Sequence, residues 1–107
     1  YPGLESSPYY SLAKKYFSGK GGAIVTIRTG SKEKAFKLMN NLQIPSIATN
    51  IGDTRTLVIH PASTIYIHNT PEQMENAGVY DDTIRISVGI EDIEDLIDDF
   101  SQAIKNI

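Results

Sequence analysis

The segment "TIRISVGIEDIEDLIDDF", residues 83–100, gives the clearest indication of the fold class, because its hydrophobic period changes within a few residues. In its first part Ile84, Ile86 and Val88 alternate with polar residues, which predicts a strand with one apolar face. A strand that leads this quickly into an amphipathic helix indicates a helix packed against a sheet. The predicted helix has one apolar stripe, made of Ile93, Leu96, Ile97, Phe100, Ile104 and Ile107.

Capping signals predict three more helices. Ser7 precedes Pro8 and is predicted to cap a helix that runs through residues 9–17 and ends near Gly19. Ser31 is predicted to cap a helix that ends before Pro45. The segment "NTPEQMENAG", residues 69–78, contains the strongest local signal. Thr70 is its predicted N-cap, position 71 is proline, position 73 completes a capping box, and position 78 is a glycine stop.

The remaining ordered segments are extended. Residues 22–29 alternate as a strand, and two short extended pieces between residues 46 and 59 flank a turn that contains Gly52. The order is therefore helix, strand, helix, short strands, short helix, strand, helix. This order predicts one α+β domain over residues 1–107, with a small, mostly antiparallel sheet covered by helices on one face.

Composition limits the functions that this domain can have. The chain has 107 residues, no cysteine, 40% hydrophobic residues and a net charge of −3. The absence of cysteine excludes disulfides and thiolate chemistry and fits a cytoplasmic protein. The scattered basic residues argue against nucleic acid as a partner, and no apolar run predicts a membrane span. The chain lacks an initial Met, which suggests a processed chain or a piece of a longer protein.

Two groups of residues invite a metal hypothesis. Asp92, Asp95 and Asp99 lie in the acidic run, but without the spacing of a calcium loop they are better interpreted as a solvated helix face. His60 and His68 have no third ligand at a useful spacing for zinc. We therefore predict no metal site.

Arg85 is a more informative cation. It lies on the polar face of the predicted strand, where Thr83 and Ser87 flank it and offer hydroxyl groups to a carboxylate. A bidentate guanidinium on a rigid strand holds a carboxylate in one orientation better than lysine does. The alternative is a salt bridge with the carboxylates that follow in sequence. The residues alone leave both readings open and show no catalytic machinery.

Four segments together resemble a known family. They are "YPGL" (1–4), "GGAIVTIRTG" (21–30), "NIGDTRTLVIHPAST" (50–64) and "IRISVGIEDIEDLIDDFSQAI" (84–104). They are similar to the C-terminal part of the Cys/Met-metabolism pyridoxal-phosphate enzymes, which include O-acetylhomoserine sulfhydrylases, methionine and cystathionine γ-lyases, and cystathionine γ-synthase. The resemblance implies the small C-terminal domain of a fold type I enzyme, which lies over the active site of a large domain.

The resemblance also implies a role for two residues. Arg85 occupies the position that grips the substrate α-carboxylate, and Asn50 helps to orient the carboxylate or its arginine. Asn50 favours an O-acetylhomoserine sulfhydrylase, which converts O-acetylhomoserine and sulfide to homocysteine and acetate in transsulfuration and methionine biosynthesis. The alternatives are a γ-lyase, a cystathionine γ-synthase or a stand-alone binding domain. Ile65 and Tyr66 replace the Thr-His of many relatives, so the selectivity of those relatives does not transfer directly.

In such enzymes the cofactor, pyridoxal 5'-phosphate, is bound by the large domain together with the catalytic lysine. We find no Ser-x-x-Lys context and expect neither a catalytic nor a cofactor-binding residue in these 107 residues. The resemblance implies that the chain is an inactive fragment by itself. Its expected partners are the amino-acid substrate, the large domain of the same chain and further subunits of a homotetramer.

Overall fold

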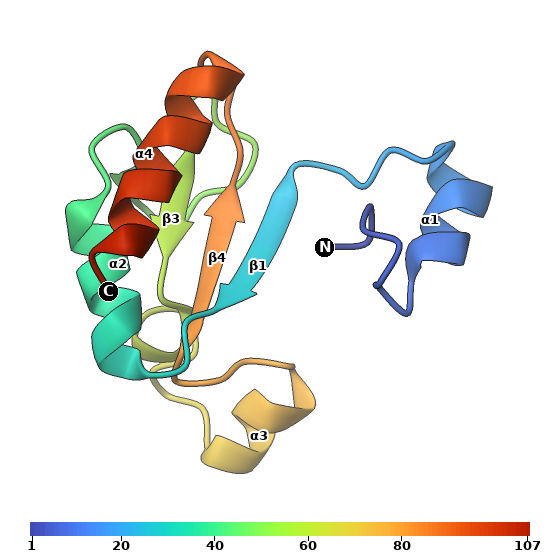
Figure 1. The fold of residues 1–107 in the computed structure, drawn as a ribbon. Helices are drawn as coiled ribbons and strands as arrows, with labels where there is room; N and C mark the ends of the chain where they lie inside the picture. The colour runs from blue at the N-terminus through green and yellow to red at the C-terminus, as the bar shows by residue number, and fades with distance from the viewer.

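The computed structural model describes residues 1–107 and contains the helices and strands in the predicted order (Figure 1). None of its helices is long and apolar enough to cross a membrane. The elements are α1 (Tyr10–Phe17), β1 (Ile24–Arg28), α2 (Lys32–Asn41), β2 (Ser46–Ile47), β3 (Leu57–Ile59), the 3-10 turn η1 (Pro61–Ser63), α3 (Pro71–Asn76), β4 (Thr83–Ser87) and α4 (Ile93–Lys105).

The four strands form one mixed sheet in the order β1-β4-β3-β2. Strand β4 pairs antiparallel with both β1 and β3, and the short β2 pairs parallel with β3. Because β4 has a neighbour on each side, the segment that predicts the fold is also the centre of the sheet. The predicted α+β class with a mostly antiparallel sheet is confirmed.

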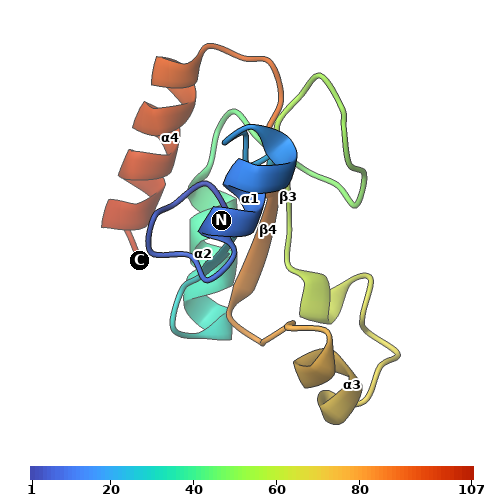
Figure 2. The ribbon, with the colours of Figure 1, turned by 90° about the vertical axis from the view of Figure 1, so that its right-hand side faces the viewer.

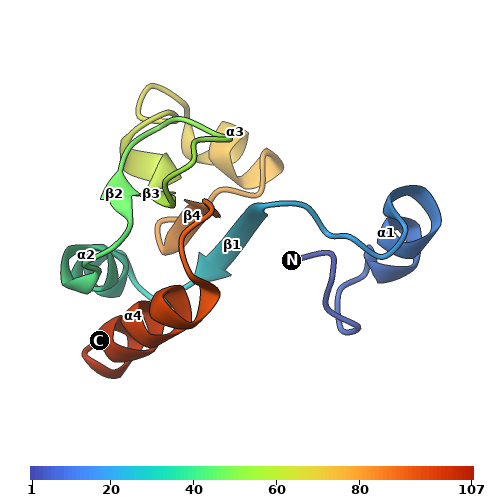
Figure 3. The same ribbon diagram turned by 90° about the horizontal axis from the view of Figure 1, so that it is seen from above.

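The core lies between this sheet and two helices. Val25 of β1 and Val58 of β3 both pair with Ile86 of β4, so the three side chains share one face of the sheet. Figure 3 shows α2 and α4 together on one side of the sheet. The buried cluster comprises Ala35, Leu38, Met39, Val58, Ile84, Ile86 and Ala103.

Two predicted caps are confirmed and one is wrong. The Ser31 hydroxyl accepts from the backbone N–H of Lys34, and Thr70 forms the full capping box with Gln73. Ser7 does not cap α1, which begins at residue 10. Its Oγ instead accepts from the backbone N–H of Tyr9, and this local turn delays the start of the helix.

Helix α1 lies apart from the rest of the chain, beyond the β1 edge of the sheet (Figures 1 and 3). Seen from that side, it stands in front of the sheet (Figure 2). Ala13 is its only buried residue. Leu12, Tyr16 and Phe17 are about half or more exposed, so most of the apolar surface of α1 is uncovered within these 107 residues.

The apolar stripe predicted for α4 faces the sheet but is only partly buried: Leu96 is buried, and Phe100 and Ile107 pack against the core. The buried residues of α4 are Leu96, Asp99 and Ala103, whose spacing places them on one helical face. Ile93 and Ile97 remain at least half exposed because they lie at the edge of this face. The helix packs on the sheet with one side only, so these two isoleucines of the predicted stripe are only partly covered.

Candidate functional site

Arg85 lies in the middle of the central strand, on the face of the sheet opposite α2 and α4. It pairs with Thr26 on one side and Ile59 on the other, while its neighbours Ile84 and Ile86 point into the core. Its Nη2 donates to the Thr49 carbonyl at 2.8 Å and makes a longer contact of 3.5 Å to the Asn50 carbonyl. The strand and these carbonyls fix where the guanidinium lies.

No carboxylate pairs with Arg85 in this structure. The three ion pairs of the chain are Arg28–Asp82, Lys37–Glu33 and Arg55–Asp53. Both contacts of Arg85 use Nη2, so Nε and Nη1 have no hydrogen-bond partner within the chain. A half-buried guanidinium with unpaired N–H groups is suited to bind an anion that comes from outside the domain. The alternative of a salt bridge to the acidic helix is wrong.

The hydroxyl ledge predicted around Arg85 is also wrong. Thr83 and Ser87 share the face of Arg85, but both are buried. The Thr83 hydroxyl accepts from the backbone N–H of Tyr80, and the Ser87 hydroxyl accepts from that of Gly52. These hydroxyls therefore serve the fold and do not face solvent, because loops cover this face of β4.

Asn50 lies beside Arg85, as the resemblance implies, but its side chain is not what contacts the arginine. The contact runs from the Arg85 Nη2 to the Asn50 backbone carbonyl, and the exposed Asn50 amide group has no partner within the chain. The structure thus brings both predicted site residues together. It adds Thr49, which no sequence motif indicates, because a contact through a backbone carbonyl does not depend on the residue type.

Asp99 corrects the interpretation of the acidic run as a solvated face. It is only 7% exposed, and its carboxylate accepts from the backbone N–H groups of Gln43 and Ile44 and from the Gln102 amide. Burial raises the pKa of Asp99, but these hydrogen bonds outweigh it and the pKa is lowered overall. Asp92 caps α4 by accepting from Glu94 and Asp95 N–H groups. The structure contains no cluster of acids and histidines that could hold a metal ion.

Glu91 lies one residue before the Asp92 N-cap of α4 and binds Thr56, the residue that precedes β3. Its Oε1 accepts from the Thr56 backbone N–H at 2.6 Å, and its Oε2 accepts from the Thr56 hydroxyl at 2.7 Å. Burial raises the pKa of Glu91, but the hydrogen bonds from the two Thr56 donors outweigh this effect, so the pKa is lowered overall. Its position one residue before the Asp92 cap was the signal that it is not helical.

A second buried acid joins the ends of β1 and β4. Asp82 accepts from Arg28 Nε at 2.8 Å and from the Gly30 backbone N–H at 3.0 Å, and the Arg28 guanidinium stacks on the Tyr80 ring. Burial of Asp82 raises its pKa, but the Arg28 and Gly30 hydrogen bonds lower it overall. Both Arg28 and Asp82 are thereby used within the fold, unlike Arg85.

His60 is a structural residue. It is buried at the end of β3, and its Nε2 lies 2.6 Å from the Asp81 carbonyl. Because a carbonyl only accepts, Nε2 carries the proton and Nδ1 accepts from the Ser63 hydroxyl at 2.8 Å. Both ring nitrogens are occupied within the fold, which leaves neither for a metal or for catalysis.

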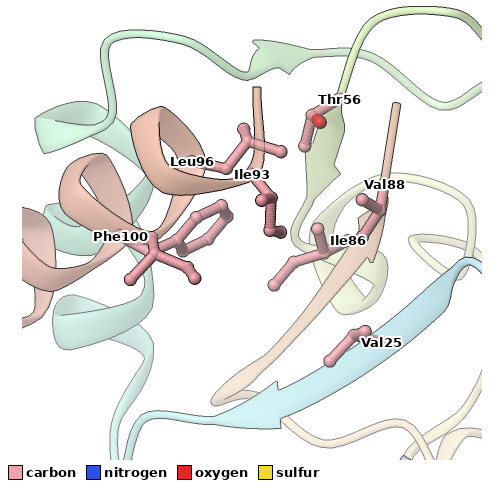
Figure 4. A pocket seen from close by; sticks show the side chains of 8 residues that line it. Val25, Thr56, Ile86, Val88, Ile93, Leu96 and Phe100 are labelled. Atoms are coloured by element: carbon pink, nitrogen blue, oxygen red, sulfur yellow. The ribbon is translucent and has the colours of Figure 1, made fainter. Parts of the chain in front are cut away.

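An apolar groove of about 230 Å³ lies between α4 and the sheet (Figure 4). It lies on the face of the sheet that α4 covers, because its lining residue Ile86 is next to Arg85 on β4 and points to the opposite face. The groove contains no charged group, so it does not suit the carboxylate or amino group of an amino acid. Its lining is Val25, Thr56, Ile86, Val88, Ile93, Leu96, Ile97 and Phe100.

Comparison with known proteins now identifies the family. A family model described as Cys/Met metabolism PLP-dependent enzyme matches residues 1–105. This chain belongs to that family. The match agrees with the segments that flank Arg85 and Asn50, and it means that the chain comes from a group of enzymes that depend on pyridoxal phosphate.

Individual members of the Cys/Met-metabolism family are similar along the whole chain. The O-acetyl-L-homoserine sulfhydrylase 1 of Thermus thermophilus is 44% identical over 97% of this chain and 25% of its own length. The L-methionine gamma-lyase of Fusobacterium nucleatum is 43% identical over 100% of this chain and 27% of its own length. The chain therefore spans about a quarter of the length of the curated relatives that it matches.

A solved structure of the same family confirms the fold. It is described as an O-acetylhomoserine (thiol)-lyase from Campylobacter jejuni with N'-pyridoxyl-lysine-5'-monophosphate. It superposes with a TM-score of 0.90 at 38% identity, over 98% of this chain and 25% of that chain. The small α+β domain of this chain is thus also present in that solved structure of a Cys/Met-metabolism enzyme.

Proposed function

We propose that this chain is the C-terminal, substrate-binding domain of an O-acetylhomoserine sulfhydrylase. Arg85 binds the α-carboxylate of the amino acid, and the Thr49 and Asn50 carbonyls hold the arginine in place. The observation that carries the proposal is a guanidinium on the central strand with no carboxylate of its own. Fixing the carboxylate orients the substrate relative to the reacting groups, which lowers the entropic cost of the reaction.

The residues around Arg85 fit the substrate and not the cofactor. No lysine lies on β4 or in residues 49–55, and the lysines of the chain are on α1, in the segment that follows it, on α2 and at the end of α4. We therefore place pyridoxal phosphate and its lysine in a large domain of the same enzyme. When bound, the cofactor supplies the electron sink for reactions of the amino acid.

We also propose what this domain packs against in the full-length enzyme. The exposed apolar residues of α1, including Leu12 and Tyr16, would pack against the large domain, since they are largely uncovered here and the relatives are about four times as long. Assembly as a homotetramer, a cytoplasmic location, and the absence of nucleic-acid and membrane partners stay predictions. An open reading frame of roughly 400 residues with an upstream lysine motif would support this organisation over a stand-alone binding domain.

A methionine γ-lyase is the second candidate, because such an enzyme is 43% identical along the entire chain. The full-length enzyme should be assayed side by side with O-acetylhomoserine plus sulfide, O-succinylhomoserine plus sulfide, cystathionine and methionine. Preferred turnover of O-acetylhomoserine supports the sulfhydrylase. Preferred elimination from methionine, with little sulfide-dependent product, would assign the chain to the γ-lyases.

The role of Arg85 is tested in the same full-length enzyme. Arg85→Lys keeps the charge but loses the planar fork, and Arg85→Ala loses both. Loss of a charge-assisted, desolvated pair corresponds to about 2–5 kcal/mol, so kcat/KM should fall about thirtyfold to several thousandfold for every amino-acid substrate. The melting temperature should change little, because no carboxylate in the domain pairs with Arg85. A destabilised Arg85→Ala variant with nearly normal kcat/KM would refute the assignment.

A further inference from the structure

Residues 49–55 form a bracket around Arg85. The bracket begins with the Thr49 carbonyl, which accepts from Arg85 Nη2 at 2.8 Å. It leaves β2 just after Ala48, whose backbone N–H donates to the Val58 carbonyl at 3.3 Å. The position of the guanidinium therefore depends on where this loop lies over the sheet.

Ser87 fixes the middle of the bracket. Its hydroxyl accepts from the Gly52 backbone N–H at 3.2 Å, three residues beyond Thr49. Gly52 has a φ of 77°, a left-handed conformation that glycine adopts without strain and that turns its N–H toward the sheet. Ser87 is two residues from Arg85 on β4 and shares its face, so one strand carries both the arginine and an anchor of its bracket.

Glu91 fixes the far end of the bracket. Its two carboxylate oxygens accept from the backbone N–H and the hydroxyl of Thr56, and the Thr56 hydroxyl in turn accepts from the Gly89 N–H at 2.9 Å. The Ile90 N–H donates to the Thr54 carbonyl at 2.9 Å. A Cβ at Gly89 would lie 2.4 Å from that carbonyl oxygen, so only glycine permits this close approach.

We propose that Ser87 and Glu91 are positioning residues for the substrate carboxylate, which they serve by holding residues 49–55 against Arg85. The inference rests on the proposed role of Arg85. Ser87 and Glu91 do not touch the substrate, and their effect is limited to the binding of its α-carboxylate. A loosened bracket lets the guanidinium leave its orientation, which weakens recognition of the carboxylate and leaves contacts with the rest of the substrate unchanged.

The experiment compares two ligands that differ only in the carboxylate, L-homoserine and 3-aminopropan-1-ol. Their dissociation constants are measured by titration of the full-length enzyme, and the ratio of the two constants reports the preference for the carboxylate. Ser87→Ala and Glu91→Gln should each lower this preference about five- to thirtyfold, the factor expected for loss of one anchoring hydrogen bond. The affinity for 3-aminopropan-1-ol should stay unchanged.

Asp99→Asn is the matched control. Asp99 is also a buried carboxylate that accepts backbone N–H groups, but its donors are Gln43 and Ile44, outside the bracket. This variant should lower the melting temperature and leave the carboxylate preference as in the wild type. An equal loss of preference in Asp99→Asn would show that general destabilisation, and not the bracket, weakens carboxylate binding.

A double variant separates the inference from the proposed function. Arg85→Ala should remove the carboxylate preference, and Glu91→Gln should then have no further effect on it. If Arg85→Ala keeps the preference, the proposed function fails. If Arg85→Ala removes it while folded Ser87→Ala and Glu91→Gln enzymes retain the wild-type preference, only the bracket inference is overturned.

Discussion

Replacement of Asp99 tests how a buried acid joins α4 to the end of α2. Its Oδ2 accepts from the backbone N–H groups of both Gln43 and Ile44 at 2.9 Å. Asp99→Ala leaves these two donors without an acceptor, and each buried unsatisfied group costs about 1–3 kcal/mol. Since Gln43 and Ile44 are themselves partly solvated, water restores some of this loss. We expect the free energy of unfolding to fall by about 2–4 kcal/mol.

Asp99→Asn should cost less, because one amide oxygen can replace Oδ2. The amide nitrogen would then face the Gln102 Nε2, which already donates to the Asn41 carbonyl at 2.6 Å. Two donors oppose each other, and turning the Gln102 amide would break its bond to Asn41. A loss of about 1–2 kcal/mol follows, roughly half that of the alanine variant.

The pH dependence of stability gives a second readout. The folded-state pKa of Asp99 lies below its ordinary value, so its stabilising contribution is complete above the unfolded-state pKa of about 3.9 and is lost as pH falls through the folded value. The difference in stability between wild type and Asp99→Asn should therefore shrink below about pH 4. Asp82 and Glu91 have lowered pKa values too, so some acid sensitivity should remain in the variant.

Urea unfolding of the 107-residue chain, followed by circular dichroism, measures these free energies. Asp98→Ala is the matched control, because Asp98 is an exposed acid next to Asp99 on the same helix and forms no ion pair. It removes the same charge without removing an acceptor. If the free energies of unfolding of Asp99→Ala and Asp98→Ala differ by less than about 0.5 kcal/mol, Asp99 behaves as a surface residue. That result would refute the stabilising role of its hydrogen bonds to Gln43 and Ile44.

Two smaller predictions concern backbone conformation. Gly89→Ala should lower the free energy of unfolding by about 1–3 kcal/mol in the same urea experiment, because its Cβ would lie 2.4 Å from the Thr54 carbonyl oxygen. An unchanged free energy of unfolding would mean that the backbone at this turn moves away without cost. Thr70→Ala should cost about 1 kcal/mol through loss of the α3 capping box and accelerate amide hydrogen exchange in 71–76 only; slower or unchanged exchange there would contradict the cap.

The elements of the fold could be predicted because their signals are local. The capping box of α3 lies within four residues, and the alternation of β4 appears in five consecutive positions. The start of α1 was misplaced for the same reason. A serine before a proline is a frequent cap, but here the hydroxyl of Ser7 forms a turn with Tyr9 before the helix begins.

The partners of the acids could not be predicted because they are distant in sequence. Asp99 binds backbone groups 55 and 56 residues away, and Glu91 binds a threonine 35 residues away. In sequence, Asp98 and Asp99 are two equal members of an acidic run. The spacing of Asp99 from Leu96 and Ala103 was the available signal, since it places the carboxylate on the buried face of α4.

The alternation of β4 also explains why Arg85 has no partner although many acids follow it. Helix α4 packs on the face that carries Ile84 and Ile86, and a side chain one position along the strand points to the opposite face. The sheet therefore lies between the guanidinium and every carboxylate of α4. An arginine at position 84 or 86 would lie beneath that acidic helix and be neutralised by it. At position 85 it keeps free N–H groups, and only a carboxylate that approaches from the other side of the sheet can use them.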